Sequence, residues 1–375
     1  MSPAQRVVIR VDSSVSIGTG HVYRCLALAA ELSARGANVS FICRDLPGNL
    51  NANIVQEGFR LVELPSPENL SDSNAWLGGV AIEADIHDTA EAISGPVDWL
   101  IVDHYGIDAR WESRFRDRVN KIAVIDDTAN RTHACDVLID QNFSAEAASR
   151  YQGLVSDECS LALGPRYALL REAFARARRF AGPREGVIRR VLVFFGGTDA
   201  SNHTSVAARA LRPFLGRGGL VDVVLGRNYA FQQELRVEFG SEANLRFHTS
   251  NSDMPELMRK ADLAIGAGGT QTWERCCMYL PSLVVSVAAN QEQACHALAE
   301  RGCILFLGRD SEVGWQKIET VISALEQVPS WVRMLSRAAG DLVDGAGCSR
   351  VADLLFVAET GMAGGTERNA RTVAK

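Results

Sequence analysis

The chain has 375 residues, of which 47% are hydrophobic, and its 45 acidic and 39 basic residues give a net charge of −6. The length exceeds what one hydrophobic core usually serves, so we expect two domains. The negative charge excludes a broad basic surface, and we expect no nucleic-acid partner.

The cysteines and the apolar runs narrow the class of protein further. None of the nine Cys belongs to a C-x-x-C pair, which argues against a zinc site and a disulfide framework. Polar residues precede Val7, and no apolar run approaches the roughly 20 residues that span a bilayer. We therefore expect a cytoplasmic protein with no bound metal, no cofactor and no membrane contact.

Short β-branched runs alternate with amphipathic stretches in the first half, which is typical of parallel α/β units. A helix is expected over residues 22–35, where apolar residues recur at helical spacing and Gly36 provides a stop. The chain thus opens with a β-α-β unit. The expected strands cover residues 7–11, 38–42, 99–102, 121–125 and 137–139.

A charged stretch with three Gly and Pro residues, 176–190, predicts a connection between domains. The strand pattern then restarts at residues 191–195, 221–225, 244–248, 263–265, 283–287 and 304–307. We predict an α/β fold with two doubly wound Rossmann-like domains facing a central cleft, where such sheets bind ligands. The expected ranges are 1–180 for an N-terminal domain, 187–360 for a C-terminal domain and 361–375 for a disordered tail.

The turn between the first strand and the first helix contains Gly18, Gly20 and His21. Glycines let the backbone approach a ligand, and the helix N-terminus beyond them attracts anions. The alternative is a tight βα connection in which His21 only begins a helix and Arg24 lies at the surface. Side chains at this strand end stand where open sheets bind ligands. We take His21 and Asp12 as catalytic candidates and Ser13, Gly20 and Arg24 as substrate-binding candidates.

A second Gly-rich turn, 266–270, ends the expected strand 263–265 and opens a helix. Its backbone N–H groups can hold a diphosphate, and Thr270 or Thr272 can cap the helix while donating a hydroxyl. The Glu274 carboxylate can accept hydrogen bonds from both ribose hydroxyls, or it is simply a first-turn acid that favours the helix dipole. The turn 196–199 ends a strand of the same sheet. The binding candidates here are Gly197, Gly268, Gly269, Thr270 and Glu274.

Polar residues also follow other expected strands. Such side chains bind sugar hydroxyls or amides, or they cap the next helix. Tyr105 and Asn290 join the catalytic candidates, although Asn290 is alternatively the N-cap of a helix that starts near Gln291. The individual roles of Asp12, Arg24, Asp103, Asp126 and Asp127 stay open.

Two patterns are missing. No G-x-G-x-x-G follows the first strand of either half, which argues against a dinucleotide site. No D-x-D triplet occurs, which argues against a glycosyltransferase that holds its sugar nucleotide through a metal.

Several separated motifs, in order, resemble those of the hydrolases that release UDP from a UDP-linked altropyranose in pseudaminic acid biosynthesis. The likeness runs from about residue 7 to about residue 306. The motifs occupy residues 10–14, 18–21, 102–105, 124–127, 140–142, 194–199, 266–277 and 290–291.

The resemblance implies the two-domain glycosyltransferase-B (GT-B) fold and metal-independent, inverting hydrolysis of UDP-2,4-diacetamido-2,4,6-trideoxy-β-L-altropyranose. It makes His21 the base that activates water, a role that suits an imidazole whose reference pKa is about 6.5. Tyr105 and Asn290 would line the sugar pocket, and Asp12 and Arg24 would orient water or sugar. UDP would be held by Gly268, Gly269, Thr270 and Glu274.

Two other functions compete with this interpretation. A GT-B transferase would pass a UDP-activated amino sugar to an acceptor, and a noncatalytic protein would only bind the sugar nucleotide. His21, Tyr105 and Asn290 together argue against the second, because UDP binding alone needs only the second domain. The sequence leaves the sugar stereochemistry, the domain closure and the oligomeric state open, and a monomer is compatible with it.

Overall fold

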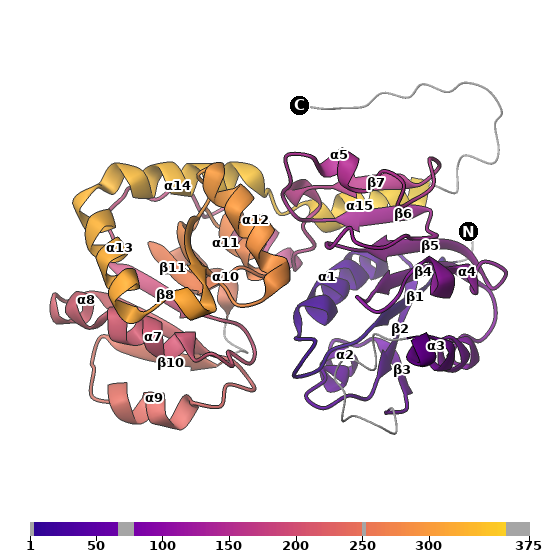
Figure 1. Cartoon of the computed structure of the whole chain (residues 1–375), viewed down its shortest axis with the longest axis horizontal. Coiled ribbons are helices and arrows are strands. Elements are labelled where there is room, and N and C mark those ends of the chain that lie inside the picture. Colours follow the sequence, from indigo (N-terminus) through magenta and orange to yellow (C-terminus); the bar gives the residue numbers. More distant parts are fainter. Residues whose placement is uncertain (1–3, 67–78, 250–252, 358–375) are drawn as a thin grey trace.

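Two parallel sheets carry the fold of the computed structural model, which describes residues 4–66, 79–249 and 253–357. Figure 1 shows them side by side, each flanked by helices. The first sheet has the order β3-β2-β1-β4-β5-β6-β7. Its strands are β1 (Arg6–Val11), β2 (Asn38–Arg44), β3 (Arg60–Leu64), β4 (Val97–Asp103), β5 (Val119–Ile125), β6 (Val137–Asp140) and β7 (Ser160–Leu163).

The second sheet has the order β10-β9-β8-β11-β12-β13. All six of its strands were expected from the sequence, whereas β3 and β7 of the first sheet were not. The strands are β8 (Arg190–Phe194), β9 (Leu220–Leu225), β10 (Leu245–Thr249), β11 (Leu263–Ala267), β12 (Ser282–Ser286) and β13 (Leu305–Arg309).

Helices cover both faces of each sheet. Those of the first half are α1 (Gly20–Ala34), α2 (Asn51–Gln56), α3 (Gly79–Ala92), α4 (Ala109–Ser113), α5 (Ala147–Arg150) and α6 (Glu172–Arg178). Those of the second half are α7 (His203–Ala210), α8 (Arg212–Gly216), α9 (Gln232–Phe239), α10 (Met254–Lys260), α11 (Gln271–Cys277), α12 (Ala289–Glu300), α13 (Trp315–Gln327), α14 (Pro329–Leu342) and α15 (Gly347–Val357).

The central strands are buried on both faces, which explains their continuous apolar runs. In β1, Val7, Ile9 and Val11 pack into one core cluster and Val8 into the cluster on the opposite face. The prediction of two doubly wound α/β sheets is confirmed. In each sheet the strand order reverses next to the first strand, between β1 and β4 and between β8 and β11. Ligands of such sheets bind beyond the carboxyl ends of these strands.

The charged connection between the sheets begins inside α6, so that residues 179–189 form the irregular link. Helix α15 returns to the first sheet, as Figure 1 shows, although the expected second domain ran to residue 360. Val351 and Leu355 are fully buried in the core around β1, and the indole of Trp99 donates a hydrogen bond of 3.0 Å to the carbonyl of Leu355. The expected disordered tail, residues 361–375, lies outside the described residues.

We expect Leu355→Ala to lower the free energy of unfolding of the first domain by about 3 kcal/mol, because the change leaves a cavity in its core. Leu161→Ala is the matched control, since that side chain is 37% exposed on β7, and it should cost less than about 1 kcal/mol. Urea denaturation followed by tryptophan fluorescence measures both. Equal losses would mean that α15 contributes nothing to the first domain.

Across residues 4–66, 79–249 and 253–357, no helix combines the length and the apolar character needed to cross a membrane.

Candidate active site

His21 is the second residue of α1 and lies at the tip of β1, beside the tip of β4. Its Nδ1 is 2.6 Å from a carboxylate oxygen of Asp103, the last residue of β4. Burial alone would raise the pKa of Asp103, but the charge of Arg24 and the contact with His21 outweigh it and hold this pKa well below its ordinary value. Asp103 is therefore an ionised hydrogen-bond acceptor.

The ionised acceptor fixes the tautomer of the imidazole. Nδ1 of His21 must carry the hydrogen that it donates to Asp103, so Nε2 keeps its lone pair. Arg24 Nη2 also lies 3.1 Å from Nδ1, a close approach rather than a hydrogen bond because both atoms then carry hydrogen. Nε2 has no hydrogen-bond partner in the part of the chain that the structure describes. The pair has the arrangement of a general base with an orienting carboxylate.

Arg24 connects this pair to a second acid. Its guanidinium donates twice to Asp103, at 2.6 Å each, and once to Asp127 at 2.9 Å. The other Asp127 oxygen accepts from the hydroxyl of Tyr105 at 2.9 Å. Arg24 is 2% exposed, so the alternative interpretation, in which it lies at the surface, is wrong. The predicted contact of Arg24 with the substrate stays a prediction.

Tyr105 joins the two domains. Its ring stands edge-on to the His21 ring, with centroids 4.6 Å apart, and its hydroxyl accepts a hydrogen bond of 3.0 Å from the Asn290 side chain of α12. The alternative role of Asn290 as an N-cap is wrong, because α12 begins at Ala289 and its N-cap is Ala288. The structure thus brings His21, Tyr105 and Asn290 together, and their predicted catalytic and sugar-binding roles stay predictions.

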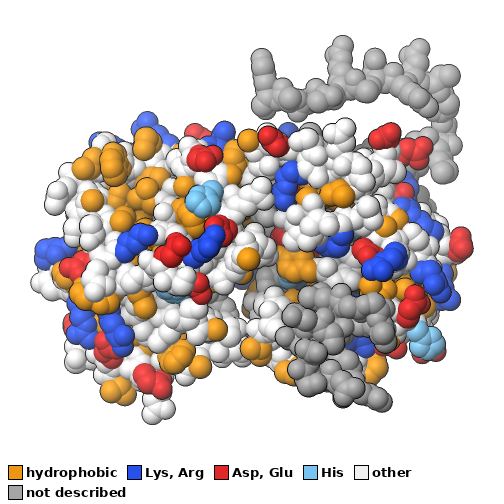
Figure 2. Space-filling view, in the orientation of Figure 1, with side chains coloured by type: hydrophobic (Ala, Val, Ile, Leu, Met, Phe, Trp, Pro, Cys, Tyr) orange, Lys and Arg blue, Asp and Glu red, His pale blue; other side chains and the backbone are white. Residues whose placement is uncertain are grey.

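The Gly-rich turns of the two domains face each other closely. A Cβ added to Gly20 would lie 3.1 Å from Thr270 Oγ1, and one added to Gly197 would lie 3.5 Å from Thr19 Oγ1. Figure 2 shows the seam between the domains, which is hollowed at its lower end. The Gly-rich turns of the two domains therefore meet at this seam.

The turn before α11 needs its glycines for packing as well. A Cβ on Gly268 would come within 2.4 Å of Cys295 Sγ in α12. Thr270 is the N-cap of α11 but makes no side-chain capping bond, and the hydroxyl of Thr272 accepts from Arg275 at 2.9 Å. The prediction that one of these hydroxyls caps the helix is therefore wrong. Thr272 accepts from Arg275, and Thr270 has helical backbone angles (φ −49°, ψ −31°) instead of the extended ones that a capping residue usually has.

Glu274 lies in the first turn of α11, and its side chain is 17% exposed. Its nearest cation is Arg171 Nη2, at 3.9 Å, from the start of α6. Burial raises the pKa of Glu274, and the charges of Arg171 and Arg275 oppose this only in part. A half-buried carboxylate whose ion-pair contact is as long as 3.9 Å has lone pairs to offer to ligand hydroxyls.

Asp12 and Ser13 are buried and form hydrogen bonds with other residues of the first domain. Asp12 is 1% exposed and accepts from Arg10 Nη1 at 2.6 Å and from the backbone N–H of Arg44 at 2.7 Å. The hydroxyl of Ser13 accepts from the N–H of Leu50 at 2.9 Å. These bonds fix the tips of β1 and β2. The predicted contacts of both residues with the substrate stay predictions.

Asp126 and Asp127 are neighbours in the chain but have different hydrogen-bond partners. Asp126 is fully buried and accepts from the N–H of Ala129 and from the hydroxyls of Thr128 and Tyr151, so it shapes its own loop. Asp127 instead reaches the Tyr105 and Arg24 network. Among the described residues, no group of three or more His, Cys, Asp and Glu side chains is placed to hold a metal ion.

Sequence reasoning missed the role of Asp103, because nothing in the sequence pairs it with His21. The signal that could have found it is its place at the tip of β4, next to β1 in a doubly wound sheet. The register aligns Val11 with Asp103, which sets the carboxylate beside the turn that carries His21.

Solved structures of other proteins share this architecture over nearly the whole chain. MurG of Acinetobacter baumannii matches 94% of this chain and 99% of its own, with a TM-score of 0.61 and 13% identity. The calicheamicin glycosyltransferase CalG4 matches 96% of this chain and all of its own, with a TM-score of 0.62 and 14% identity. A Neisseria meningitidis UDP-GlcNAc 2-epimerase bound to UDP-GlcNAc matches 94% of this chain and all of its own, with a TM-score of 0.62 and 10% identity.

The two facing parallel sheets and these neighbours define a two-domain protein of the GT-B fold. No protein-family model matches the chain. Its sequence is similar to the UDP-2,4-diacetamido-2,4,6-trideoxy-β-L-altropyranose hydrolase of Campylobacter jejuni, with 27% identity over 79% of this chain and 97% of that protein. The resemblance inferred from the separated motifs is thus confirmed.

Two further relatives match this chain over only part of their own length. The spore coat polysaccharide biosynthesis protein SpsG of Bacillus subtilis is 29% identical over 51% of this chain and 57% of its own length. An uncharacterized protein of Methanocaldococcus jannaschii is 24% identical over 75% of this chain and 55% of its own. The matched region thus spans little more than half of each of these two proteins.

Proposed function

We propose that the protein hydrolyses a UDP-linked diacetamido sugar, UDP-2,4-diacetamido-2,4,6-trideoxy-β-L-altropyranose, as a step of pseudaminic acid biosynthesis. The observation that carries the proposal is the His21–Asp103 pair, which stands at the mouth of the cleft opposite the Gly-rich turn of the second domain. The name of the Campylobacter jejuni relative supplies the substrate.

In the proposed reaction, Nε2 of His21 accepts a proton from water while the water oxygen attacks the anomeric carbon. The bond between that carbon and the diphosphate oxygen breaks, and its electron pair leaves with UDP. Asp103 holds the ring in the productive tautomer and stabilises the imidazolium that forms. The base belongs to the first domain and the diphosphate turn to the second, an arrangement that supports attack from the side opposite UDP and hence inversion.

In this proposal the second domain binds and stabilises the UDP leaving group. UDP carries its own charge, so loop N–H groups of residues 266–270 can stabilise it without a metal or a carboxylic acid. Glu274 would accept hydrogen bonds from the ribose hydroxyls. Tyr105 and Asn290 would contact the sugar, which requires the hydrogen bond between them to open or to be shared with the ligand.

We expect Glu274→Gln to weaken UDP binding about tenfold, because hydrogen bonds to a charged acceptor contribute about 1.5–3 kcal/mol and the amide retains part of this. The turnover of saturating substrate should change much less. Glu172→Gln, on a side chain that is 76% exposed in α6, is the matched control. Titration calorimetry with UDP measures both, and an unchanged dissociation constant would rule out the ribose contact.

The direct test is incubation of the purified protein with the UDP-linked diacetamido sugar and a chelator, with no acceptor present. We expect stoichiometric UDP and free sugar, with the newly released α anomer detected by proton NMR before mutarotation. Release that requires a divalent cation would contradict the metal-independent mechanism, and no release would contradict the hydrolase.

A GT-B glycosyltransferase is the second candidate, because MurG and CalG4 share the fold and the cleft has room beside Asn290. It predicts that UDP is released only when an acceptor sugar is added. A protein that only binds the nucleotide would release none under either condition.

A further inference from the structure

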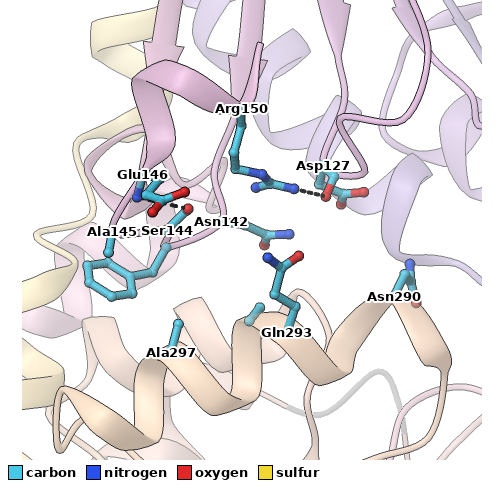
Figure 3. A pocket seen from close by; sticks show the side chains of 11 residues that line it. Asp127, Asn142, Ser144, Ala145, Glu146, Arg150, Asn290, Gln293 and Ala297 are labelled. Atoms are coloured by element: carbon cyan, nitrogen blue, oxygen red, sulfur yellow. Dashed lines mark hydrogen bonds between the residues drawn. The ribbon is translucent and has the colours of Figure 1, made fainter. Parts of the chain in front are cut away.

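A cavity of about 230 Å³ lies between the domains, beside the proposed reaction centre. One wall is α12, and the other is the loop between β6 and α5 together with Asp127 and Arg150, as Figure 3 shows. Hydrolysis needs one water, which takes roughly 30 Å³ of liquid volume. The cavity is therefore large enough for a part of the substrate.

The cavity begins at Asn290, which is hydrogen-bonded to Tyr105, and extends along one face of α12. Asn290, Gln293, Ala294 and Ala297 line it at positions i, i+3, i+4 and i+7, which share one face of a helix. At a rise of about 1.5 Å per residue, the wall is about 10 Å long. Its inner end is Asn290, which is bonded to Tyr105 and so stands next to His21.

Glu146 also lines the cavity but is exposed to solvent, whereas the other two charged groups, Arg150 and Asp127, already have partners. Arg150 donates to Asp140 at 2.8 Å and to the carbonyl of Asp127 at 3.3 Å. The Asp127 carboxylate accepts from Arg24 and Tyr105. A ligand in this cavity therefore meets no unpaired charge from these residues, which favours a neutral group.

Two side-chain amides remain available. Figure 3 shows Asn142, from the first domain, and Gln293, from the second, pointing toward each other across the cavity. Within the described residues, neither amide has a hydrogen-bond partner. Each carboxamide offers both a donor and an acceptor. Together they match a group that itself carries one N–H and one carbonyl.

Apolar surface lies beside these amides. Phe143 packs against the core of the second domain, and Ala294 and Ala297 add methyl groups to the same cavity. An amide-binding pair next to small apolar surface suits an N-acyl group, in which an amide ends in a methyl.

We propose that this cavity binds an N-acylamino substituent of the UDP-linked sugar, with Asn142 and Gln293 as the residues that determine specificity for it. The inference rests on the proposed hydrolase function and deepens it. The UDP end of the substrate contacts the Gly-rich turns, and the acylated end contacts the amides beyond Asn290.

The test compares Asn142→Ala, Gln293→Ala and the double variant with the wild-type protein. We expect each single change to raise KM for the diacetamido substrate about three- to tenfold, since a neutral hydrogen bond contributes about 0.5–1.5 kcal/mol. The dissociation constant of UDP should stay within about twofold. Gln233→Ala, at an exposed position of α9, is the matched control and should change neither quantity.

A second substrate, which lacks the acyl groups, tests whether the change in KM depends on them. With the same UDP-linked sugar carrying free amines, the variants and the wild type should have equal KM values. Equal effects on both substrates, an effect on UDP alone or no effect on either would each overturn the proposal. Calorimetric binding of the intact sugar nucleotide gives the same comparison without turnover, so the cavity can be tested even if the wild type hydrolyses nothing.

The same neutral N-acyl chemistry could come from a separate acceptor sugar. Millimolar N-acetylated monosaccharide is therefore added to the reaction with the sugar nucleotide. A disaccharide product that disappears in Gln293→Ala would place an acceptor in the cavity and overturn the assignment to the donor substituent. We expect only the free sugar.

Discussion

His21→Ala should lower kcat about 10³-fold and leave the dissociation constant of UDP within about threefold. A positioned general base contributes typically 10²–10⁴ in rate, and Nε2 of His21 is the group that we propose takes the proton from water. In the proposed arrangement the other domain binds UDP, so the affinity for UDP should not depend on the imidazole. Steady-state release of UDP and calorimetry measure the two quantities.

The matched control is His87→Ala, since this side chain is 71% exposed on α3. It should leave both quantities unchanged. A His21→Ala protein that turns over at the wild-type rate would remove His21 from the mechanism.

Asp103→Asn should lower kcat by about 10²–10⁴, although Asp103 does not touch the substrate in the proposed mechanism. An amide cannot hold the imidazole in the productive tautomer as the carboxylate does, and the comparable change in a serine protease triad costs about 10⁴. The variant also leaves the buried Arg24 without its main partner, so the free energy of unfolding should fall by about 3–5 kcal/mol. Rates are therefore measured at a temperature where denaturation curves show the variant fully folded.

The double variant separates a positioning role from a structural one. If Asp103 acts through His21, then His21→Ala combined with Asp103→Asn is no slower than His21→Ala alone. Multiplicative losses would mean that Asp103 acts independently of the imidazole. Asp117→Asn, at an exposed position between α4 and β5, is the control and should have no effect on the rate.

The sequence indicated the fold wherever strands are buried on both faces. In the second sheet, β8, β9, β11 and β12 were expected from their apolar runs, and the edge strands β10 and β13 were expected as well, although both have exposed positions. In the first sheet, the edge strands β3 and β7 were missed, since each is short and only one of its residues is buried. The docking of α15 was missed as well, since it depends on contacts such as that of Trp99 with Leu355, 256 residues away.

The positions of the candidate site residues could be predicted from the sequence, but the contacts between their side chains could not. The rule that ligands bind beyond strand tips located His21, Tyr105 and Asn290. Which carboxylate pairs with which base depends on register and side-chain packing. Asp12 pairs with Arg10 and Asp103 with His21, and sequence alone assigned neither pair.

The position of an oxygen-18 label tests the central claim most directly. The purified protein is incubated with the UDP-linked diacetamido sugar in oxygen-18 water, with a chelator and without acceptor, and both products are analysed by mass spectrometry. Attack of water at the anomeric carbon predicts one labelled oxygen in the free sugar and none in UDP. Label in UDP would mean attack at phosphorus and would contradict the account.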